Sequence, residues 1–591
     1  MKAFISLIYC LYIVIGSMAQ TLPSARSVNW KLSGLRDTAS MGFVEFDMQA
    51  SGVVGDGLTP NDSVLSSVLS AVSGPGAILI FPAGNFLFNN SIVLPSDVII
   101  RGQGAENTTF SMDLGGSGHA FSIAGYQVNT DTSSLIQNAV KDSSILYVAN
   151  PSLFIAGNWI RIVQQDSDLV TSAWAVHSVG QIVQIISIVN NKLLLASPLR
   201  MDFPLSRIAS IVRIEAVKNV GIECFKINRI DNTAPLQSSN IYFGDAVNCW
   251  VSGIESQNCT FSHFEAECSS NLSVSKSYFH HAFEYGDGGR GYGVVLHFTT
   301  NECLVEDNVF EHLRHSMILQ AGANGNVFAY NYSIDPYWTT FPNNSSGDMV
   351  LHGNYVYSNL FEQNIGQNIV IDNSHGPNGP YNTFFRNRAA GYGIFFSASN
   401  SPDQNFLGNE ITNLGFPYSL VNYTILGNGH FIFGNNNKGT IDPAGTQNLP
   451  DSSYAYQFRP VFIPVSQWAA IGSPNTMGSA GIPAASRYVA GTIFSSSCGN
   501  TVVAIPEDLA TEDKIKVYPN PVNDEFIIQI PNQRLRSTFK LYTIFGQRIM
   551  NESPGNNEQL TIKRKGLASG LYFYEVLQNN SVVQKGKIVF R

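Results

Sequence analysis

Histidines are concentrated in one part of this 591-residue sequence. Eight of the eleven lie between residues 263 and 375, namely His263, His280, His281, His297, His312, His315, His352 and His375. Histidine gains and loses its proton near neutral pH, so such a concentration indicates acid–base or binding chemistry. The side chains can act together only if the fold brings them side by side.

The same part of the chain carries a repeat built around asparagine. Short β-rich runs each end in a turn that contains one Asn, giving Asn308, Asn331, Asn364, Asn387, Asn409 and Asn435. The spacings of 23, 33, 23, 22 and 26 residues, without amphipathic helical runs, are typical of a β solenoid. Stacked turns would let each amide donate to one rung and accept from another. We therefore expect an all-β fold, a right-handed parallel β-helix.

Counting back from the turn asparagines locates one outward face of this solenoid. The polar residues at matching positions, after allowance for a loop at 377–380, are Glu267, His297, Gln320, His352 and Asp372. Neighbouring rungs lie about 4.8 Å apart. His352 and Asp372 should therefore touch, and His297 should lie two rungs from His352. The rung of Asp372 would add two residues and nearby turns three more: His375, Arg388, Arg290, Arg314 and His315.

These residues suit β-elimination on a uronic acid, which needs a base, a cation against the carboxylate and a proton donor for the leaving oxygen. His352, held by the carboxylate of the next rung, is the predicted base. Arg388 or Arg290 would neutralise the substrate carboxylate. Tyr292 or His297 would protonate the leaving oxygen.

Two alternatives remain open. Paired-acid hydrolysis needs carboxylates about 5 to 9.5 Å apart, whereas Glu267 and Asp372 would be about 19 Å apart at four rungs. A loop acid such as Asp348, Glu311 or Asp287 would have to serve as the partner. A non-catalytic glycan-binding adhesin is the other alternative, because His, Asn and Gln are common on the outer faces of solenoids.

Composition and targeting narrow the class of protein. The net charge of −9 argues against a nucleic-acid partner held through phosphates. Residues 1–19 have the pattern of a secretory signal peptide, with Lys2, an apolar run and a small-residue cleavage site. The apolar run is short for a membrane anchor. The seven cysteines lack zinc-site spacing, and Cys249 and Cys268 align as stacked thiols or as a possible disulfide.

The N-terminal part resembles the pectate-lyase superfamily over about residues 45–440. The motifs are Gly55-Asp56-Gly57, Phe81-Pro82-Ala83-Gly84 and Gly102-Gln103-Gly104. The resemblance implies a β-helix capped by a short helix, expected at 63–72. Its activity stays open, since the superfamily includes lyases, glycoside hydrolases, epimerases and phage tailspikes. No Asp-rich cluster typical of calcium-dependent pectate lyases stands out, so we expect no metal or cofactor, with calcium left open.

The remaining segments divide the chain. Residues 20–500 would form the β-helix domain, with an antiparallel β insertion at 135–205 and a C-terminal cap at 440–500, followed by a linker at 501–513. Residues 514–591 resemble the C-terminal sorting domain of the type IX secretion system of Bacteroidetes. The carrying motifs are Tyr518-Pro519-Asn520-Pro521, Gly546-Gln547, Gly570-Leu571-Tyr572 and Lys585-Gly586-Lys587. A small carbohydrate-binding sandwich is the alternative for this tail.

We therefore expect a secreted or cell-surface enzyme, acting as a monomer, that passes through the type IX machinery and cleaves an extracellular, preferably acidic, polysaccharide by elimination. The expected catalytic residues are His352, Asp372, His297 and Arg388. The expected substrate-binding residues are Glu267, Arg290, Tyr292, Arg314, His315, Gln320 and His375.

Overall fold

The computed structural model describes most of the chain in two compact units, residues 1–503 and 504–591. In the first unit the described residues are 20–36, 42–72, 76–233, 235–286, 288–420, 424–493 and 498. In the second they are 516–518, 522–529, 537–543, 548–553, 559–564, 566–578 and 581–591. The expected signal peptide and linker, and the loop acid Asp287, lie outside the described residues.

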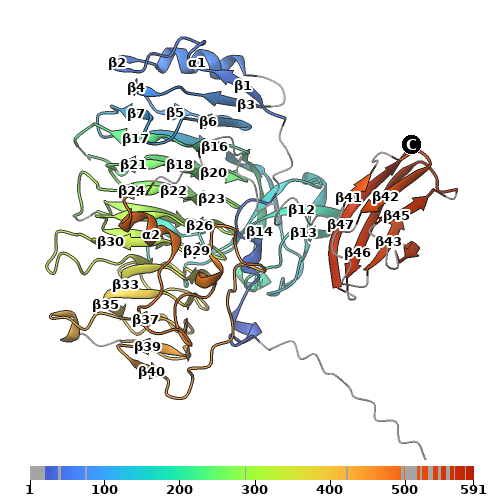
Figure 1. Ribbon diagram of the computed structural model, residues 1–591. Helices are drawn as coiled ribbons and strands as arrows, with labels where there is room; N and C mark the ends of the chain where they lie inside the picture. The colour runs from blue at the N-terminus through green and yellow to red at the C-terminus, as the bar shows by residue number, and fades with distance from the viewer. Residues whose placement is uncertain are drawn as a thin grey trace, which may run out of the picture. The chain divides into compact units, whose positions relative to one another are not determined.

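The first unit is a right-handed parallel β-helix, seen as a stack of rungs in Figure 1. One wall is a parallel sheet of twelve described strands: β1 (Val44–Asp47), β3 (Ala77–Ile80), β6 (Val98–Arg101), β16 (Gly221–Glu223), β20 (Trp250–Ser252), β23 (Ser273–Ser275), β26 (Leu304–Glu306), β29 (Val327–Ala329), β32 (Leu360–Glu362), β34 (Thr383–Phe385), β36 (Asn405–Leu407) and β38 (Phe431–Phe433).

Two further ladders of strands merge into one larger sheet. The first is β2 (Asp56–Pro60), β4 (Gly84–Phe88), β7 (Thr108–Met112), β17 (Lys226–Arg229), β21 (Glu255–Gln257), β24 (Tyr278–His280), β27 (Val309–Glu311) and β30 (Tyr332–Ile334). The second is β5 (Ile92–Val93), β8 (Phe121–Ala124), β18 (Ile241–Gly244), β22 (Ser262–Glu267), β25 (Tyr292–His297), β28 (His315–Leu319) and β31 (Met349–Leu351). Both ladders pair with the long strand β33 (Ile365–Ile371), which β35 (Arg388–Phe396), β37 (Glu410–Ile411), β39 (Asn435–Asn437) and β40 (Thr440–Asp442) follow.

The predicted asparagine ladder is confirmed. From Asn308 to Asn435, each Nδ2 donates to the Oδ1 of the next Asn at 2.9 to 3.1 Å. The residue before each of these asparagines has a positive φ, between 53° and 64°, so the chain turns sharply from one wall to the next. A second ladder, absent from the sequence analysis, runs through Asn326, Asn359, Asn382 and Gln404 at 2.9 to 3.0 Å.

Apolar side chains fill the interior, because alternate residues of each short strand point inward. Stacked rings mark the register, with Phe328, Phe361, Phe384 and Phe406 at centroid distances of 4.9 to 5.2 Å. The helix α1 (Asp62–Ala71) covers the N-terminal end and buries Leu65 against this core. The predicted helical cap is therefore present (Figure 1).

The segment after the last rung does not cap the open end as expected. Residues 449–493, here called the strap, run back along the outside of the solenoid past the twelve-stranded wall (Figure 1). The short helix α2 (Pro483–Val489) lies against β27, where Tyr488 donates to Glu311 at 2.8 Å. The backbone N–H of Tyr454 donates to Glu362 at 2.8 Å, and Arg487 pairs with Asp307 at 2.9 Å. The strap therefore buries part of the outer surface that sequence counting treats as exposed.

The disulfide considered between Cys249 and Cys268 is not formed. A disulfide joins Cys224 to Cys498, with their Cα atoms 5.6 Å apart, whereas Cys249 and Cys268 are free. The strand register places Cys249 beside Leu272, and Cys268 lies at the corner after β22. The expectation that Cys249 and Cys268 share a column was therefore wrong.

The insertion is a six-stranded antiparallel sheet that spans residues 126–215, wider than expected. Its strands, in spatial order, are β10 (Ile145–Tyr147), β13 (Lys192–Leu195), β12 (Gln181–Val189), β11 (Trp159–Val163), β14 (Ser210–Glu215) and β9 (Tyr126–Ser134). The expected antiparallel pairing of β11 with β12 is confirmed. In Figure 1 this sheet lies beside the middle of the solenoid.

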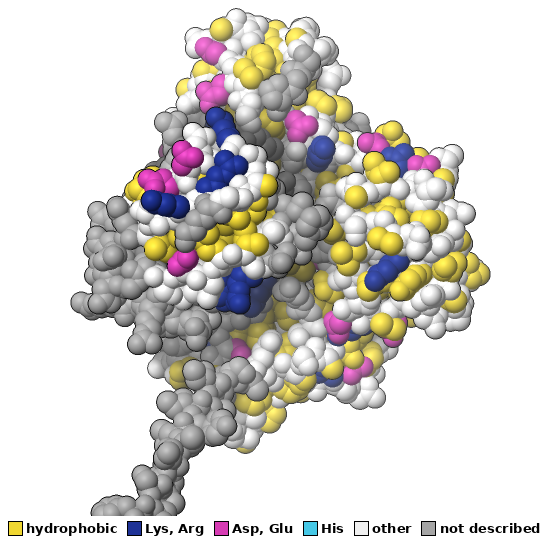
Figure 2. Space-filling view, turned by 90° about the vertical axis from the view of Figure 1, so that its right-hand side faces the viewer, with side chains coloured by type: hydrophobic (Ala, Val, Ile, Leu, Met, Phe, Trp, Pro, Cys, Tyr) yellow, Lys and Arg dark blue, Asp and Glu magenta, His cyan; other side chains and the backbone are white. Residues whose placement is uncertain are grey.

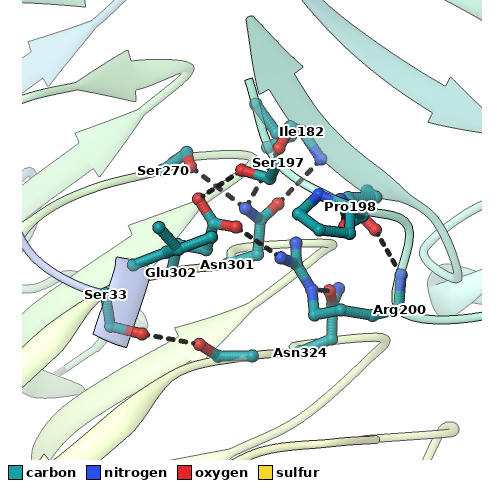
Figure 3. Close-up of polar contacts among 12 residues, drawn as sticks. Ser33, Ile182, Ser197, Pro198, Arg200, Ser270, Asn301, Glu302 and Asn324 are labelled. Carbon is teal, nitrogen blue, oxygen red and sulfur yellow. Dashed lines mark hydrogen bonds and ion pairs between the residues drawn. The ribbon is translucent and has the colours of Figure 1, made fainter. Parts of the chain in front are cut away.

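Buried polar contacts fasten the insertion to the solenoid (Figure 3). Glu302, at the corner after β25, accepts a hydrogen bond from Arg200 of the insertion at 2.6 Å and also pairs with Arg36. The neighbouring Asn301 accepts from the backbone N–H of Ile182 at 2.7 Å and donates to its carbonyl at 3.1 Å. The loops of the insertion are therefore held at defined positions over the solenoid.

The second unit is a small β-sandwich. One sheet contains β41 (Lys516–Tyr518), β42 (Glu525–Gln529) and β45 (Gln559–Lys563), and the other contains β44 (Arg548–Glu552), β43 (Ser537–Thr543), β46 (Gly570–Gln578) and β47 (Ser581–Phe590). Phe526, Phe539, Leu541, Val576 and Phe590 contribute to its own buried core. The predicted sandwich fold is therefore present.

Surface charge is mixed on the face shown in Figure 2. Among the described residues, Lys and Arg are dispersed between acidic, apolar and uncharged side chains and form no broad basic patch there. A phosphate backbone would need such a patch.

Candidate active site

Strand pairing aligns the predicted column. Glu267 at the end of β22 pairs with His297 at the end of β25. In the following rungs Leu296, Leu319, Leu351 and Ile371 are paired in line. Each lies in the core and directly precedes His297, Gln320, His352 and Asp372. Alternation therefore directs the column outward from the solenoid, as predicted.

The first part of the column is a histidine held by two carboxylates. Nε2 of His297 lies 3.1 Å from Oε1 of Glu265 and 3.1 Å from Oε1 of Glu267. Burial acts to lower the pKa of His297, but the hydrogen bonds to the two carboxylates outweigh it and raise the pKa to about 9. His297 is therefore an imidazolium at neutral pH.

The two carboxylates are themselves held in place. Tyr242 donates to Oε2 of Glu267 at 2.9 Å, and Ser239 donates to Oε2 of Glu265. Among the described residues, Glu265, Glu267 and His297 form the one group of three potential metal ligands whose atoms lie within 4.8 Å of one another. They are the residues that could hold a divalent ion, although the imidazolium proton already balances part of their charge.

The second part of the column is the pair His352 and Asp372. Nδ1 of His352 lies 2.5 Å from Oδ2 of Asp372. Burial acts to raise the pKa of Asp372, but the adjacent His352 and the bonds from Ser374 hold it well below its usual range. The ionised carboxylate therefore lies against the Nδ1 edge of the imidazole and leaves Nε2 on the opposite edge of the ring.

Three predicted binding residues form a row of contacts that starts at His352. The ring of His315 lies 5.7 Å from that of His352, and burial together with the charges of His352 and Arg314 lowers the pKa of His315 to about 3. Tyr292 lies 5.1 Å from His315, and burial raises its pKa to about 12. The guanidinium of Arg314 lies 5.9 Å over the ring of Tyr292. Neutral His315, protonated Tyr292 and cationic Arg314 thus follow one another away from the pair.

Arg314 is a cation without a carboxylate partner among the described residues. Its Nη1 donates to the carbonyl of Gly286, while its Nε is buried without a partner. The other predicted arginine of the loops, Arg290, pairs instead with Glu284. Arg314 is therefore the loop cation free to meet an anionic ligand.

The structure does not bring Arg388 to the column. Arg388 pairs with Ile365 at the start of β33, on another wall from Asp372, which follows the end of that strand. Its Nε donates to Glu410 at 2.9 Å, and Glu410 also accepts the backbone N–H of Gly472 from the strap. Glu410 thus links Arg388 to the strap, and the expectation that Arg388 meets the substrate carboxylate was wrong.

The insertion supplies the other wall of the site. The ring of His375 lies 4.8 Å from His352 and 5.3 Å from Trp174 of the insertion. Trp174 also lies 5.7 Å from Phe298, whose ring is 4.6 Å from His297. A continuous row of rings therefore connects the two parts of the column past Gln320, which lies between them and is 9% exposed.

Other residues of the histidine-rich segment lie elsewhere. His280, His281 and His312 are at the corner after β24 and β27, where Nδ1 of His312 lies 2.7 Å from Asp335. Glu265, by contrast, belongs to the site and was missed. It stands two positions before Glu267 on the same strand, so simple alternation would have placed it on the same face.

Comparison with known proteins identifies the tail. Residues 516–591 match the family model of the secretion system C-terminal sorting domain. No curated protein matches the chain significantly. Among the described residues, no helix is long and apolar enough to cross a membrane.

Solved structures with some similarity are mainly phage tailspikes. The tailspike of Pseudomonas phage LKA1 has a TM-score of 0.44 and 13% identity, over 62% of this chain and 64% of that chain. The tailspike of Pseudomonas phage phi297 has a TM-score of 0.41 and 12% sequence identity, over 66% of this chain and 65% of that chain. The catalytic unit of an α-1,3-glucanase from Streptomyces thermodiastaticus has a TM-score of 0.34 and 11% sequence identity, over 70% of this chain and 68% of that chain. The chain thus spans less than two thirds of each of the two tailspikes.

The strand pairing establishes the fold, and the C-terminal sorting domain establishes the export route. The chain is a right-handed parallel β-helix protein with a C-terminal sorting domain of the type IX secretion system, exported to the cell surface or beyond.

Proposed function

We propose that the chain is a polysaccharide lyase that cleaves a uronate-containing extracellular glycan by β-elimination at His352. One observation carries this proposal: His315, whose ring lies 5.7 Å from that of His352, is the chain neighbour of Arg314, a cation that no described carboxylate neutralises. A base next to an available cation is the combination that removal of a proton α to a carboxylate requires.

The steps follow from this arrangement. Arg314 binds the C6 carboxylate and stabilises the charge that develops on it. Nε2 of His352 takes the proton from C5, while Asp372 stabilises the imidazolium that forms. The electron pair of that C–H bond forms the C4–C5 double bond, and the C4–O4 bond breaks. The leaving oxygen takes the proton of Tyr292, which is present at neutral pH.

Tyr292 and His297 both lie on β25, so their distance in rungs from His352 is the same, and their side-chain contacts decide between them as proton donor. His297 lies two rungs from His352, about 10 Å at 4.8 Å per rung. We choose Tyr292 because a single ring, that of His315, separates it from His352, whereas the rings of Phe298, Trp174 and His375 separate His297 from His352. Tyr292 lies 5.1 Å from His315, which in turn contacts His352, and the charge of Asp372 acts on Tyr292.

Product analysis tests the proposal. The mature protein, incubated with a panel of uronate-containing, sulfated and neutral glycans, should release oligosaccharides that carry the ultraviolet absorbance of a C4–C5 double bond and lack the mass of one water. The same products should be absent with His352→Ala. Release of reducing ends without this absorbance would reject elimination.

Hydrolysis is the second candidate, and Glu265 favours it. Retaining glycosidases place two carboxylates about 5 to 5.5 Å apart, and oxygen atoms of Glu265 and Glu267 lie within 4.8 Å of each other. Both carboxylates accept from His297, so the imidazolium would have to serve as the acid. Hydrolytic products that depend on Glu265 and not on His352 would support this candidate.

A glycan-binding role without catalysis is the remaining alternative. It predicts that the protein retains a glycan unchanged and that His352→Ala and Asp372→Ala bind it as the wild type does.

A further inference from the structure

We infer that the sugar next to the cleaved uronate is a neutral pyranose, bound between Trp174 of the insertion and Glu267 of the solenoid, so that the substrate is a mixed polymer of uronate and neutral sugar. The inference rests on the proposed elimination at His352 and names the polymer on which it acts.

Trp174 has the features of a sugar platform. Its side chain is 46% exposed, although it is the largest apolar side chain type and a buried position would be more favourable. The indole N–H has no hydrogen-bond partner among the described residues, whereas those of Trp30, Trp250 and Trp338 are all bonded. A half-exposed indole with a free donor suits the C–H face and a hydroxyl of a pyranose.

The loop that carries Trp174 is built rigidly. The buried carboxylate of Asp166 accepts from the backbone N–H groups of His177 and Val179 at 2.8 and 2.9 Å. Asn354 accepts from the N–H groups of Thr171 and Ser172 at 2.9 and 3.1 Å. The loop is therefore tied both to itself and to the rung that follows His352. Little ordering of this wall is needed when a ligand binds.

The position of Trp174 places its ligand next to the reacting centre. On one side its ring contacts His375, which contacts His352. On the other side it contacts Phe298, which follows His297. A sugar stacked on Trp174 would thus lie between the proposed base and the carboxylates that hold His297.

Charge at this subsite excludes a second uronate. Glu265 and Glu267 place two carboxylates around the single imidazole of His297, so this subsite is acidic whether or not that ring carries a proton. His119, the next histidine, has its pKa lowered by burial and adds no charge at neutral pH. The cation of the adjacent insertion strand, Arg161, bonds to Thr299 and to the carbonyl of His177.

The charge of the proposed subsite also depends on Asp245 and on the exposure of Glu267. Burial raises the pKa of the nearby Asp245 to about 6, and Arg161 acts against this rise. The carboxylate of Asp245 offsets the charge of Arg161. The side chain of Glu267 is 31% exposed and can accept hydrogen bonds from sugar hydroxyls. This subsite therefore binds the hydroxyls of a neutral sugar and repels the carboxylate of a uronate.

The test compares polymers and variants of the full-length mature protein. Elimination rates are measured on a homopolymer of uronate and on polymers in which uronate alternates with a neutral hexose. The wild type should prefer the alternating polymers by roughly tenfold or more in kcat/KM. Equal or faster cleavage of the homopolymer would overturn the inference but leave the proposed elimination standing, whereas no unsaturated product from any polymer would refute both.

Two variants locate the effect. Trp174→Ala should raise KM on the alternating polymer roughly tenfold with little change in kcat, and Trp174→Phe should recover most of it. Glu267→Gln should reduce the ratio of kcat/KM on the alternating polymer to kcat/KM on the homopolymer. Tyr126→Ala, an exposed aromatic on the same insertion sheet, is the matched control and should behave as wild type. Unchanged KM in a folded Trp174→Ala protein would overturn the role of this ring.

Discussion

Nδ1 of His352 lies 2.5 Å from Oδ2 of Asp372 because the two residues follow paired positions, Leu351 and Ile371, on adjacent rungs. Each rung thus supplies one member of the pair, and the parallel register alone brings them together. The chemistry proposed here depends on this contact.

Asp372→Asn should impair catalysis without impairing folding. The amide no longer stabilises the imidazolium that forms at His352, so kcat/KM should fall by about 10² to 10⁴, the range of a positioned general base. Initial rates of unsaturated product formation measure the effect. His312 and Asp335 form a similar pair 2.7 Å apart at another corner, so Asp335→Asn is the matched control and should retain full activity. Equal losses in both variants would contradict the assignment.

His297 should make stability depend on pH. An unfolded histidine titrates near 6.5, whereas Glu265 and Glu267, against the effect of burial, raise the pKa of His297 to about 9. The protonated ring therefore stabilises the fold fully below about pH 6.5, and this contribution disappears as the pH rises through about 9. The gap between the two pKa values corresponds to about 3 kcal/mol. Denaturant unfolding at about pH 6 and about pH 10 should show the loss.

His297→Gln provides the comparison for that measurement. Glutamine keeps a donor near the two carboxylates but does not titrate, so the variant should lose less stability between the two pH values than the wild type does. A wild type and a variant with the same pH dependence would show that His297 is not protonated between Glu265 and Glu267.

Sequence periodicity was sufficient for the solenoid and for part of the site. The asparagine spacing predicts which residues stack, and the same count places His352 beside Asp372. It wrongly assigns Arg388 to the site, because the period gives the rung of a residue and not the wall on which it lies, and Arg388 lies on the wall of Ile365. It does not place Trp174, since the docking of the insertion depends on long-range contacts such as Glu302 with Arg200. Glu265 was overlooked because one position per rung was counted.

Glu302→Gln should loosen the insertion. Arg200 is 5% exposed and would remain buried without a counter-charge, a change that costs about 3 to 5 kcal/mol. Chemical denaturation should record that loss, and KM should rise because the insertion that carries the Trp174 loop docks less firmly on the solenoid. Asp168 and Arg207 form an exposed pair at 2.6 Å in the same insertion, so Asp168→Asn should cost less than about 1 kcal/mol. A Glu302→Gln variant as stable as Asp168→Asn would contradict the anchoring role.

Asn364→Ala should destabilise the solenoid from within. Oδ1 of Asn364 accepts from both the backbone N–H and the Nδ2 of Asn331, and its Nδ2 donates to the carbonyl of Phe328 and to Asn387. Alanine leaves buried groups of Asn331 and Phe328 unsatisfied, each at a cost of about 1 to 3 kcal/mol. The expected loss in the free energy of unfolding is about 2 to 4 kcal/mol, measured by denaturant titration.

Asn364→Ser separates hydrogen bonding from packing in the same column. Ser277 occupies the equivalent position in an earlier rung, where it accepts from the N–H of Ile254 at 3.2 Å and donates to the carbonyl of Ser275 at 2.9 Å. Serine at 364 can therefore replace part of the lost bonding, and its cost should be smaller than that of alanine. If serine and alanine destabilise the protein equally, lost volume rather than unsatisfied polar groups sets the cost, and the ladder contributes less to the solenoid than its hydrogen bonds imply.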